Sequence, residues 1–407
     1  MALRISNLRQ EHHQNRSDLI AAIASRDGDT DVRFQRFSSV EGLESVQPRP
    51  DCFLILLLMH AMKTKQDIFV EDPVDPHLLF HIRGSLQTIL KLCFPELQTI
   101  HVEADPRDLS DEITTSDHVA TGFSGGVDSM QLINRKIGDP QLPDDYSVSM
   151  LMHHKVGSVT RDSHYENNVE HAKRFSGEYG LELAGASCDT ATFFSDYSFL
   201  ESHSMRTTAA TLSLSAVYRR YLFASGTDLQ VGLKAMPCRV IDALNPILLP
   251  MLRTRENEFS QFGGDSTRLE KMLEVLANYS LMRKINLCVR VSHDNAVFLN
   301  CGRCYKCFSF LLVAEAVGRL DLLSENFDLE AYRNHRTRAF TNFFVRSIGP
   351  KSMETNRQVA WFLRNHGSSE IPMIARMLLH LVPPPNATSV MGGLLKPFCV
   401  RQPSMLG

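Results

Sequence analysis

Hydrophobic and polar positions in the middle of the chain alternate between strand and helix patterns, as in a parallel sheet with crossover helices. Short apolar runs predict buried strands, and longer segments with an apolar residue every third or fourth position predict helices. The expected strands cover residues 119–123, 148–152, 181–186 and 229–233, and the expected helices cover 165–179 and 207–224. We therefore expect an α/β region over residues 116–250 in which ligands bind at the carboxyl ends of the strands.

The regions on either side have fewer clear patterns, and we treat residues 1–115 as an N-terminal extension of unknown role. Its patterned segments are an apolar run at 53–62, a strand-like run at 67–70 and helical spacing over 77–93. Beyond the α/β region the pattern turns helical. We expect a helical region with a four-cysteine metal site over 251–320 and a C-terminal helical extension over 321–407.

Composition narrows the class of protein. The 407 residues carry 43 Lys and Arg against 46 Asp and Glu, and a net charge of -3 gives no sign of bulk nucleic-acid or membrane binding. The longest strongly apolar run, 53–59, is far shorter than the roughly 20 residues of a membrane span, and the start of the chain is unlike a signal peptide. An odd number of cysteines, nine, with four clustered late in the chain, suits a metal site in a reducing cytoplasm better than disulfides. We therefore expect a cytoplasmic protein without a membrane partner.

The most informative segment is residues 124–129, which read Ser-Gly-Gly-Val-Asp-Ser between the first expected strand and an amphipathic segment. A glycine turn that leads into a helix presents unpaired backbone N–H groups at the positive end of the helix dipole, and such groups hold phosphate. Gly125 and Gly126 allow a close approach, and the two serines add hydroxyl donors. Asp128 would repel phosphate unless Mg²⁺ lies between them. The segment therefore predicts a site for a metal-bound polyphosphate.

A second motif is the cysteine cluster. Cys301, Cys304 and Cys307 are spaced so that one tight turn can wrap an ion, and Cys288 can complete a tetrahedron across an expected hairpin over 287–299. Four thiolates form a closed, structural Zn²⁺ site that stabilises the fold. A [4Fe–4S] cluster suits the same spacing, and a reactive or disulfide-bonded set remains a further alternative.

Together the turn and the C…CGxCxxC pattern resemble 7-cyano-7-deazaguanine synthase, a member of the ATP pyrophosphatases. The resemblance covers about residues 119–318. It implies a Rossmann-like parallel sheet of the adenine nucleotide alpha hydrolase type, and an ATP- and Mg²⁺-dependent carbon–nitrogen ligase. In that family ATP adenylates 7-carboxy-7-deazaguanine with release of pyrophosphate, ammonia displaces AMP to give the amide, and a second ATP drives dehydration to the nitrile.

Weaker similarities extend the resemblance to single residues. Arg206 heads the long expected helix, as an arginine does in the family, and Arg255 stands where the family has a lysine. The implied ATP contacts are Phe123, Ser124, Gly125, Gly126, Val127, Asp128, Ser129 and Arg206, the implied catalytic residues are Asp128, Ser129 and Arg255, and the implied Zn²⁺ ligands are Cys288, Cys301, Cys304 and Cys307. The chain departs from the family at His153-His154-Lys155 and at Pro237-Cys238-Arg239, where an aspartate is missing. These departures resemble a diverged branch such as those in bacterial antiphage operons.

The expected partners are a small 7-deazaguanine-type substrate and ammonia. A protein or nucleic-acid partner from the same operon and a homodimer are further possibilities. Two other functions stay open. One is a tRNA-modifying enzyme of the thiolation type, and the other is a catalytically idle nucleotide-binding component of a defence complex.

Several further residues have both a functional and a structural interpretation. These are His153 and His154 (a proton shuttle or a rim pair after a strand), Cys238 (a nucleophile or a buried cysteine), Asp189 and Asp228 (metal or ribose ligands or helix caps), and the arginines of 333–346 (a nucleic-acid patch or a solvated helix face).

Overall fold

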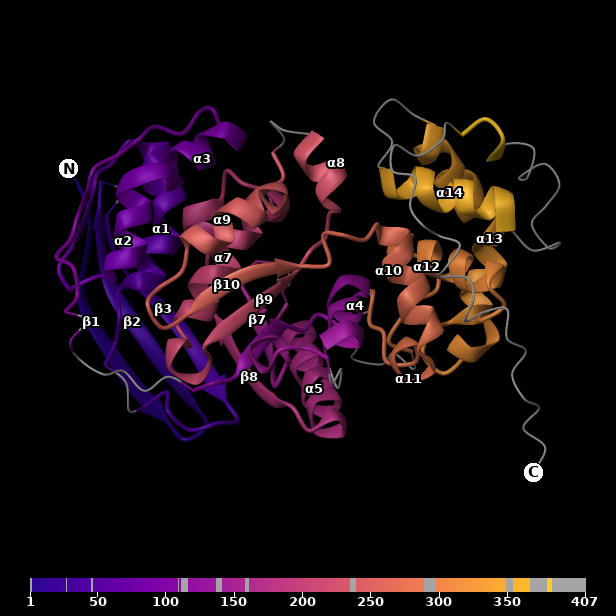
Figure 1. Cartoon of the computed structure of the whole chain (residues 1–407), viewed down its shortest axis with the longest axis horizontal. Coiled ribbons are helices and arrows are strands. Elements are labelled where there is room, and N and C mark those ends of the chain that lie inside the picture. Colours follow the sequence, from indigo (N-terminus) through magenta and orange to yellow (C-terminus); the bar gives the residue numbers. More distant parts are fainter. Residues whose placement is uncertain are drawn as a thin grey trace. The chain divides into compact units, whose positions relative to one another are not determined.

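A large, mostly parallel sheet with flanking helices forms the centre of the computed structural model, which is a mixed α/β structure (Figure 1). The structure describes residues 2–26, 28–44, 47–108, 110, 116–136, 141–157, 161–234, 239–288, 298–348, 354–366 and 379–382.

Ten strands share this sheet in the order β10-β9-β6-β7-β8-β3-β2-β1-β4-β5. Their bounds are β1 Leu3–His13, β2 Arg16–Ser25, β3 Gly28–Ser38, β4 Ile68–Val70, β5 Val102–Glu103, β6 Val119–Gly122, β7 Met150–Lys155, β8 Glu182–Ser187, β9 Arg220–Ala224 and β10 Glu258–Phe262. The strands from β10 to β8 are parallel to their neighbours, β8, β3, β2 and β1 pair antiparallel, and β1, β4 and β5 are parallel again.

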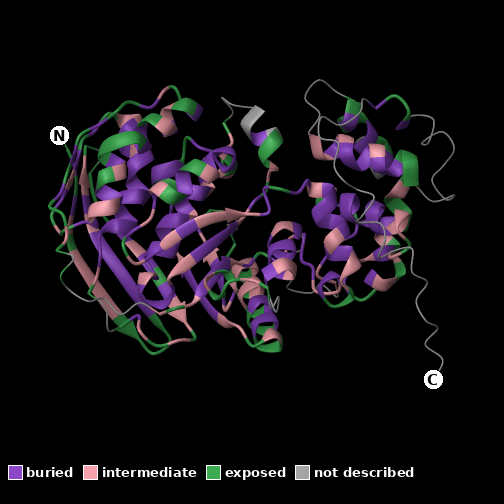
Figure 2. Ribbon diagram, viewed as in Figure 1, coloured by how far each residue is buried: buried purple, intermediate pink, exposed green. Residues whose placement is uncertain are grey.

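The helices differ in how deeply they are buried (Figure 2). Their bounds are α1 Asp51–Thr64, α2 Pro76–His81, α3 Gln87–Cys93, α4 Val127–Lys136, α5 Asp162–Tyr179, α6 Ala191–Phe194, α7 Phe199–Leu212, α8 Leu229–Lys234, α9 Asn245–Met251, α10 Arg268–Ala277, α11 Tyr279–Met282, α12 Tyr305–Ala316, α13 Leu329–Ile348 and α14 Glu354–His366. Helix α1 is buried on nearly all sides. A helix that is apolar all round belongs inside a core, which explains the expected apolar run at 53–62.

The N-terminal residues are part of the same core as the central strands. Side chains of β1 to β4 and α1 belong to one buried cluster with those of β6 to β9 and α7. Phe34 of β3, for example, packs edge-on against Phe53 of α1 with ring centroids 5.3 Å apart. The N-terminal region therefore extends the sheet rather than forming a separate layer.

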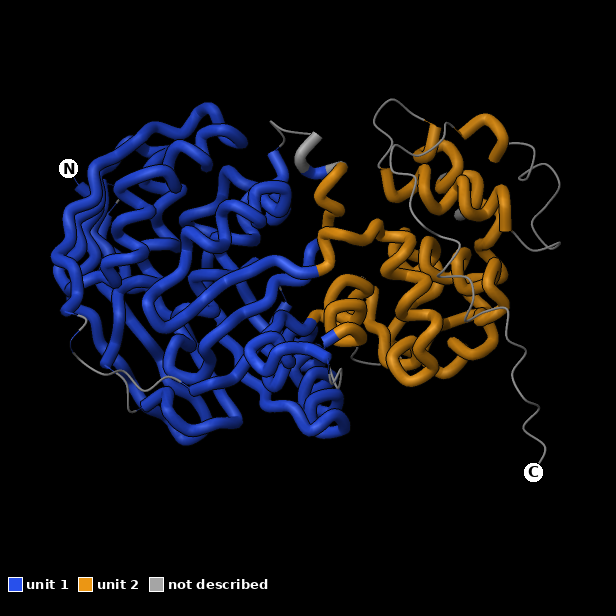
Figure 3. Tube along the Cα trace, viewed as in Figure 1, with its two compact units in different colours: residues 1–123, 136–225, 232–262 blue, residues 124–135, 226–231, 263–407 orange. Residues whose placement is uncertain are grey.

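The described residues divide into two compact units (Figure 3). Unit 1 contains residues 1–123, 136–225 and 232–262, and therefore the whole sheet. Unit 2 contains residues 124–135, 226–231 and 263–407, with helix α4 and the helices from α10 onward. The four-part division expected from the sequence stays a prediction.

Most of the strands and helices predicted for the central region are confirmed, because β6, β7, β8 and α5 overlap the predicted ranges, and β4 confirms the strand predicted at 67–70 of the N-terminal region. The helical spacing over 77–93 corresponds to α2 and α3, which a π-helical turn at Ile82–Leu86 connects. Gly84 in this turn has non-helical torsion angles, so the pattern does not describe one straight helix.

Two predictions are wrong. The helix over 207–224 ends at Leu212, and strand β9 follows from Arg220. The aromatic and apolar residues 221–223 are typical of strands, and a short apolar run has no period that separates strand from helix. The strand over 229–233 is the helix α8, because β6 and β10 already flank β9 in the sheet.

Candidate functional site

The segment 124–129 follows the central strand β6, as the sequence predicts: residues 124–126 lie in the turn and residues 127–129 begin helix α4. Parallel strands flank β6 on both sides, β7 on one and β9 on the other. Phe123, the last residue before the turn, donates its backbone N–H to Met152 O at 2.8 Å, and its ring packs 4.7 Å from that of Phe175. Gly122 needs to be glycine, since a Cβ atom there would lie 2.6 Å from the Tyr221 hydroxyl. The turn therefore starts from a fixed point in the sheet.

Internal hydrogen bonds hold the turn in one conformation. Gly125 has a φ of 69°, in the left-handed region that favours glycine. The Gly126 N–H donates to Ser124 Oγ at 3.2 Å, and the Ser129 hydroxyl donates to Gly126 O at 3.0 Å. Asn286 N–H donates to Gly125 O at 2.7 Å. Both serine hydroxyls thus stabilise the turn itself, and helix α4 starts within the segment, at Val127.

The carboxylate of Asp128 is paired with two cations of helix α10. Arg268 donates to its Oδ2, and the Lys271 ammonium lies 3.7 Å from its Oδ1. Lys271 is almost completely buried. Burial raises the pKa of Asp128, but Arg268, Lys271 and Lys306 lower it more, so the pKa of this carboxyl is below its usual value. Asp128 is therefore ionised at neutral pH within a cluster of positive net charge.

This cluster fits a polyphosphate with Mg²⁺. The two cations and the helix N-terminus attract phosphate. Asp128 Oδ1 is buried and accepts no hydrogen bond from the described residues, so it remains an oxygen that a divalent cation can use.

Sequence reasoning missed Arg268 and Lys271. Helix α10 begins with a capping box in which Thr267 Oγ1 accepts from Glu270 N–H at 3.2 Å and Glu270 accepts from Thr267 N–H at 2.7 Å. The Thr-x-x-Glu pattern can be read from the sequence. The contact of Arg268, the first residue of this helix, with Asp128, 140 residues earlier in the chain, cannot be read from the sequence.

Helices α4 and α10 are tied together further along. Arg135 forms an ion pair with Glu274, and Gln131 donates to the same carboxylate at 3.2 Å. Asn278 donates to Asn134 at 2.8 Å. These contacts fix the position of Arg268 relative to the turn.

The four cysteines predicted to bind metal lie together in unit 2. The sulfurs of Cys288, Cys301, Cys304 and Cys307 all lie within 4.8 Å of one another. The Cys304 sulfur is 4.0 Å from that of Cys288 and 3.4 Å from that of Cys307. Four sulfurs at about 2.3 Å from a tetrahedral Zn²⁺ would lie about 3.8 Å apart. The cluster is compatible with zinc, and its small size suits a single ion better than a multi-iron cluster.

Asn300, which sequence reasoning also missed, brings Cys288 to the other three cysteines. Its Oδ1 accepts from Leu287 N–H at 2.7 Å, and its Nδ2 donates to Ile285 O at 2.8 Å. Gly302 has a φ of 63°, and a Cβ atom there would lie 2.0 Å from Asp328 O. The expected hairpin over 287–299 falls largely outside the described residues.

Arg206 and Arg255 belong to unit 1, whereas residues 124–129 belong to unit 2. Arg206 is buried on α7, and Arg255 is exposed between α9 and β10, where its backbone N–H donates to Asp75 at 3.0 Å. Their roles in ATP binding and catalysis stay predictions. Cys238 lies outside the described residues.

The two histidines lie within β7 rather than after it. His153 Nδ1 is 2.7 Å from Phe123 O, and burial lowers the pKa of His154 to about 3. His154 is therefore neutral at pH 7, which favours its structural interpretation over a proton shuttle.

The arginines of α13 are partly neutralised inside unit 2. Arg333 pairs with Asp321 at 3.0 Å, Arg336 pairs with Glu315 at 2.5 Å, and Arg346 lies 5.4 Å from the centre of the Tyr305 ring. These contacts favour a solvated helix face over a nucleic-acid patch.

Among the described residues, no helix combines the length and apolar character needed to cross a membrane. Comparisons of the chain with models of protein families, with curated proteins and with solved structures find no match.

Proposed function

We propose that this chain is an ATP- and Mg²⁺-dependent carbon–nitrogen ligase similar to 7-cyano-7-deazaguanine synthase. ATP would bind at the turn 124–129 and be cleaved between its α and β phosphates. The observation that carries the proposal is the glycine turn at the end of β6, with Asp128 beside Arg268 and Lys271.

The arrangement of the sheet supports nucleotide binding at this turn. The strands that follow β6 in the chain lie on both of its sides, with β7 and β8 on one side and β9 and β10 on the other. Ligands of open parallel sheets bind outside the carboxyl ends of the strands at such a point of reversal. The order agrees with a Rossmann-like domain of the adenine nucleotide alpha hydrolase type.

The charges suit the reaction that the resemblance implies. A carboxylate oxygen of the substrate attacks the α-phosphorus, the bond to the β-phosphate breaks, and pyrophosphate leaves. Arg268, Lys271 and the backbone N–H groups of the turn would stabilise the charge that develops on pyrophosphate. Mg²⁺, when bound, neutralises part of the same charge, and Asp128 would hold it. Ammonia then attacks the acyl carbon and releases AMP.

The substrate proposed first is 7-carboxy-7-deazaguanine, whose amide would be activated in a second round. The cysteine cluster has a structural role in this proposal, because four thiolates leave a Zn²⁺ ion no open position.

A second candidate is a nucleotide-binding component without turnover. The pairing of Asp128 with Arg268 favours it, because a carboxylate whose charge is already offset by Arg268 attracts Mg²⁺ less strongly.

Incubation with labelled ATP, 7-carboxy-7-deazaguanine and ammonia tests the proposal. We expect AMP and pyrophosphate in equal amounts, dependent on all three additions and on Mg²⁺. Formation of ADP would contradict the proposed cleavage, and turnover only with another acceptor would contradict the substrate. ATP that binds but stays intact after long incubation would favour the second candidate.

A further inference from the structure

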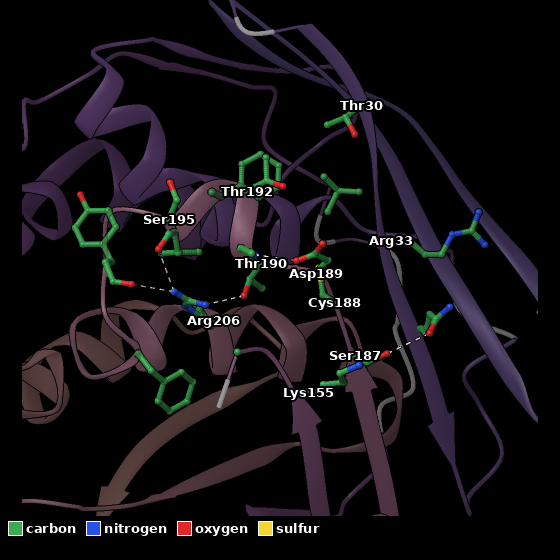
Figure 4. A pocket seen from close by; sticks show the side chains of 18 of the residues that line it. Thr30, Arg33, Lys155, Ser187, Cys188, Asp189, Thr190, Thr192, Ser195 and Arg206 are labelled. Atoms are coloured by element: carbon green, nitrogen blue, oxygen red, sulfur yellow. Dashed lines mark hydrogen bonds between the residues drawn. The ribbon is translucent and has the colours of Figure 1, made fainter. Parts of the chain in front are cut away.

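A cavity of about 860 Å³ opens in unit 1 at the carboxyl ends of β7 and β8 (Figure 4). Lys155 and Ser187, the last residues of these strands, line it together with Arg206 of α7. The volume falls in the roughly 300–1,000 Å³ typical of small-molecule sites. The cavity is therefore large enough for a ligand with a ring system.

One wall of the cavity comes from the N-terminal strand β3. The pairing of β3 with β8 ends at Gln35 opposite Ser187, whereas β3 starts at Gly28 and is paired with β2 from there to Arg36. Residues 30–33 thus extend past the end of β8, and all four line the cavity. This strand lies outside the part of the chain that resembles a known family. Residues 1–115 therefore complete a cavity that the central strands alone would leave open.

The opposite wall combines aromatic and hydroxyl side chains from the segment 187–199 with one carboxylate, Asp189, whose Oδ1 accepts from Ala191 N–H at 3.0 Å. The aromatic residues are Phe193, Phe194, Tyr197 and Phe199, and the hydroxyl residues are Ser187, Thr190, Thr192 and Ser195. Aromatic rings favour a flat, apolar portion of a ligand, and hydroxyl groups can hydrogen-bond its polar edge.

Arg206 is the one cation in the lining that has no carboxylate at ion-pair distance within the described parts of the chain. The other two cations are neutralised: Arg33 by Glu11 and Asp18, and Lys155 by Asp162. Arg206 is buried, yet its hydrogen-bond acceptors are all neutral oxygens. A buried charge without an opposite charge is costly to the fold, and an anion in the cavity would offset that cost.

One nitrogen of the Arg206 guanidinium, Nη2, makes only long hydrogen bonds, whereas Nε and Nη1 each make a short one. Its Nε and Nη1 donate to Ser202 Oγ at 2.8 Å and to Thr190 Oγ1 at 2.9 Å. Its Nη2 donates to Phe194 O and Tyr197 O at 3.4 and 3.5 Å. These two distances exceed the usual range of about 2.7–3.2 Å. An anionic oxygen would be a better acceptor for Nη2 than either carbonyl.

We propose that this cavity binds a small organic anion, a ring that carries a carboxylate or a phosphate, independently of nucleotide at the turn 124–129. Arg206 then serves this anion instead of the ATP contact predicted from the sequence. Arg206 attracts the anion, the aromatic wall holds the ring, and β3 closes the cavity.

Calorimetry on the full chain, without nucleotide, tests the proposal with pairs of probes that differ in charge. The pairs are benzoate with benzamide and phenyl phosphate with benzyl alcohol, so that they also separate a carboxylate ligand from a phosphate ligand. We expect at least one anion to bind with one-to-one stoichiometry and roughly tenfold more tightly than its neutral counterpart. If neither anion is preferred, the proposal is overturned.

Two tryptophan substitutions in one short segment locate the site. Thr192 lines the cavity and Asp196 does not, although both are exposed. Thr192→Trp should weaken anion binding roughly tenfold by filling the cavity, and Asp196→Trp should leave it unchanged. Equal effects of the two variants would contradict the location. Arg206→Gln should remove the preference for the anion over its neutral counterpart.

Two further arms separate this site from the proposed ATP site. The Asp128→Asn variant should bind the anion with the affinity of the unmodified chain. Anion binding can therefore be observed even if the chain proves not to bind or cleave ATP. Saturating Mg²⁺ and ATP should not change the affinity for the anion. Competition between ATP and phenyl phosphate would contradict independent binding.

Discussion

Among single residues, Asp128 and its two cationic partners matter most for the proposed nucleotide site. The sequence predicts that Asp128 lies in a phosphate-binding turn, because glycine, serine and helix-start signals are all local. The identity of its partners depends on how α10 packs beside α4, which no local pattern contains. Arg268 and Lys271 therefore became candidates only with the structure.

Replacing Arg268 by glutamine should lower kcat/KM for ATP by about 100-fold, because one charged donor to the leaving pyrophosphate is lost. The measurement is the rate of AMP formation at several ATP concentrations. Arg283→Gln is the matched control, since Arg283 belongs to the same unit and pairs with Glu325 at the surface. Similar activity of the two variants would contradict the role given to Arg268.

Asp51 at the start of α1 makes the stability of the chain depend on pH. Burial raises its pKa to about 6, although Arg107 opposes the shift. Because the pKa is higher in the folded than in the unfolded state, the ionised carboxylate destabilises the fold above pH 6. This cost is relieved as the pH falls from about 6 toward the unfolded value.

Asp51→Asn should remove this dependence while keeping an oxygen that accepts from Asp75 N–H. Relative to the variant, the unmodified chain should gain about 1.4 kcal/mol of unfolding free energy between pH 7 and pH 5. Urea unfolding at the two pH values measures the difference, with the exposed Asp196→Asn as control. A difference that stays constant, or that grows with rising pH, would argue against the assignment.

Among the elements, β6, β7, β8 and α5 could be predicted from the sequence because each has a distinct and continuous pattern. Strand β1 (Leu3–His13) was not predicted, since most of its residues are polar and partly exposed. Two errors are related: residues 229–233 were predicted as a strand but form α8, and the strand that does pair with β9, β10, was not predicted. Which of two short segments enters the sheet beside β9 is decided by tertiary packing rather than by local sequence.

The capping box of α10 should contribute measurably to stability. Thr267→Ala removes the hydroxyl that accepts from Glu270 N–H, and we expect a loss of about 1 kcal/mol. Thr267→Ser keeps that hydroxyl and should lose much less. Trp361, the only tryptophan of the chain, lies on α14 in the same unit, so its fluorescence during denaturation reports the change. Equal losses in both variants would contradict the capping role.

At the scale of the whole molecule, the sequence indicated an α/β structure but not the extent of its sheet. Strands β3, β2 and β1 join the parallel strands through the antiparallel pairing of β3 with β8. This pairing links residues about 150 positions apart, and no local pattern predicts it. The cavity beside Arg206 was not predicted for the same reason, since β3 forms one of its walls.

Metal removal should unfold unit 2 selectively. We expect one Zn²⁺ per chain by elemental analysis, and a strong chelator should change the Trp361 emission as the cysteine cluster opens. Cys301→Ser should lose the metal, whereas Cys93→Ser, a buried cysteine in the core of unit 1, should retain it. A metal-free chain with unchanged emission, or iron in place of zinc, would contradict the structural zinc site.

The proposed activity requires that a nucleoside triphosphate binds at residues 124–129 with Mg²⁺ held by Asp128. Calorimetry with α,β-methylene ATP, which cannot be cleaved between those phosphates, tests it most directly. We expect binding that requires Mg²⁺, that weakens roughly tenfold or more in Asp128→Asn, and that is unchanged in Asp265→Asn, which removes an exposed carboxylate of the same unit. Folded protein that shows no Mg²⁺-dependent binding, or that binds equally well after Asp128→Asn, would contradict the account.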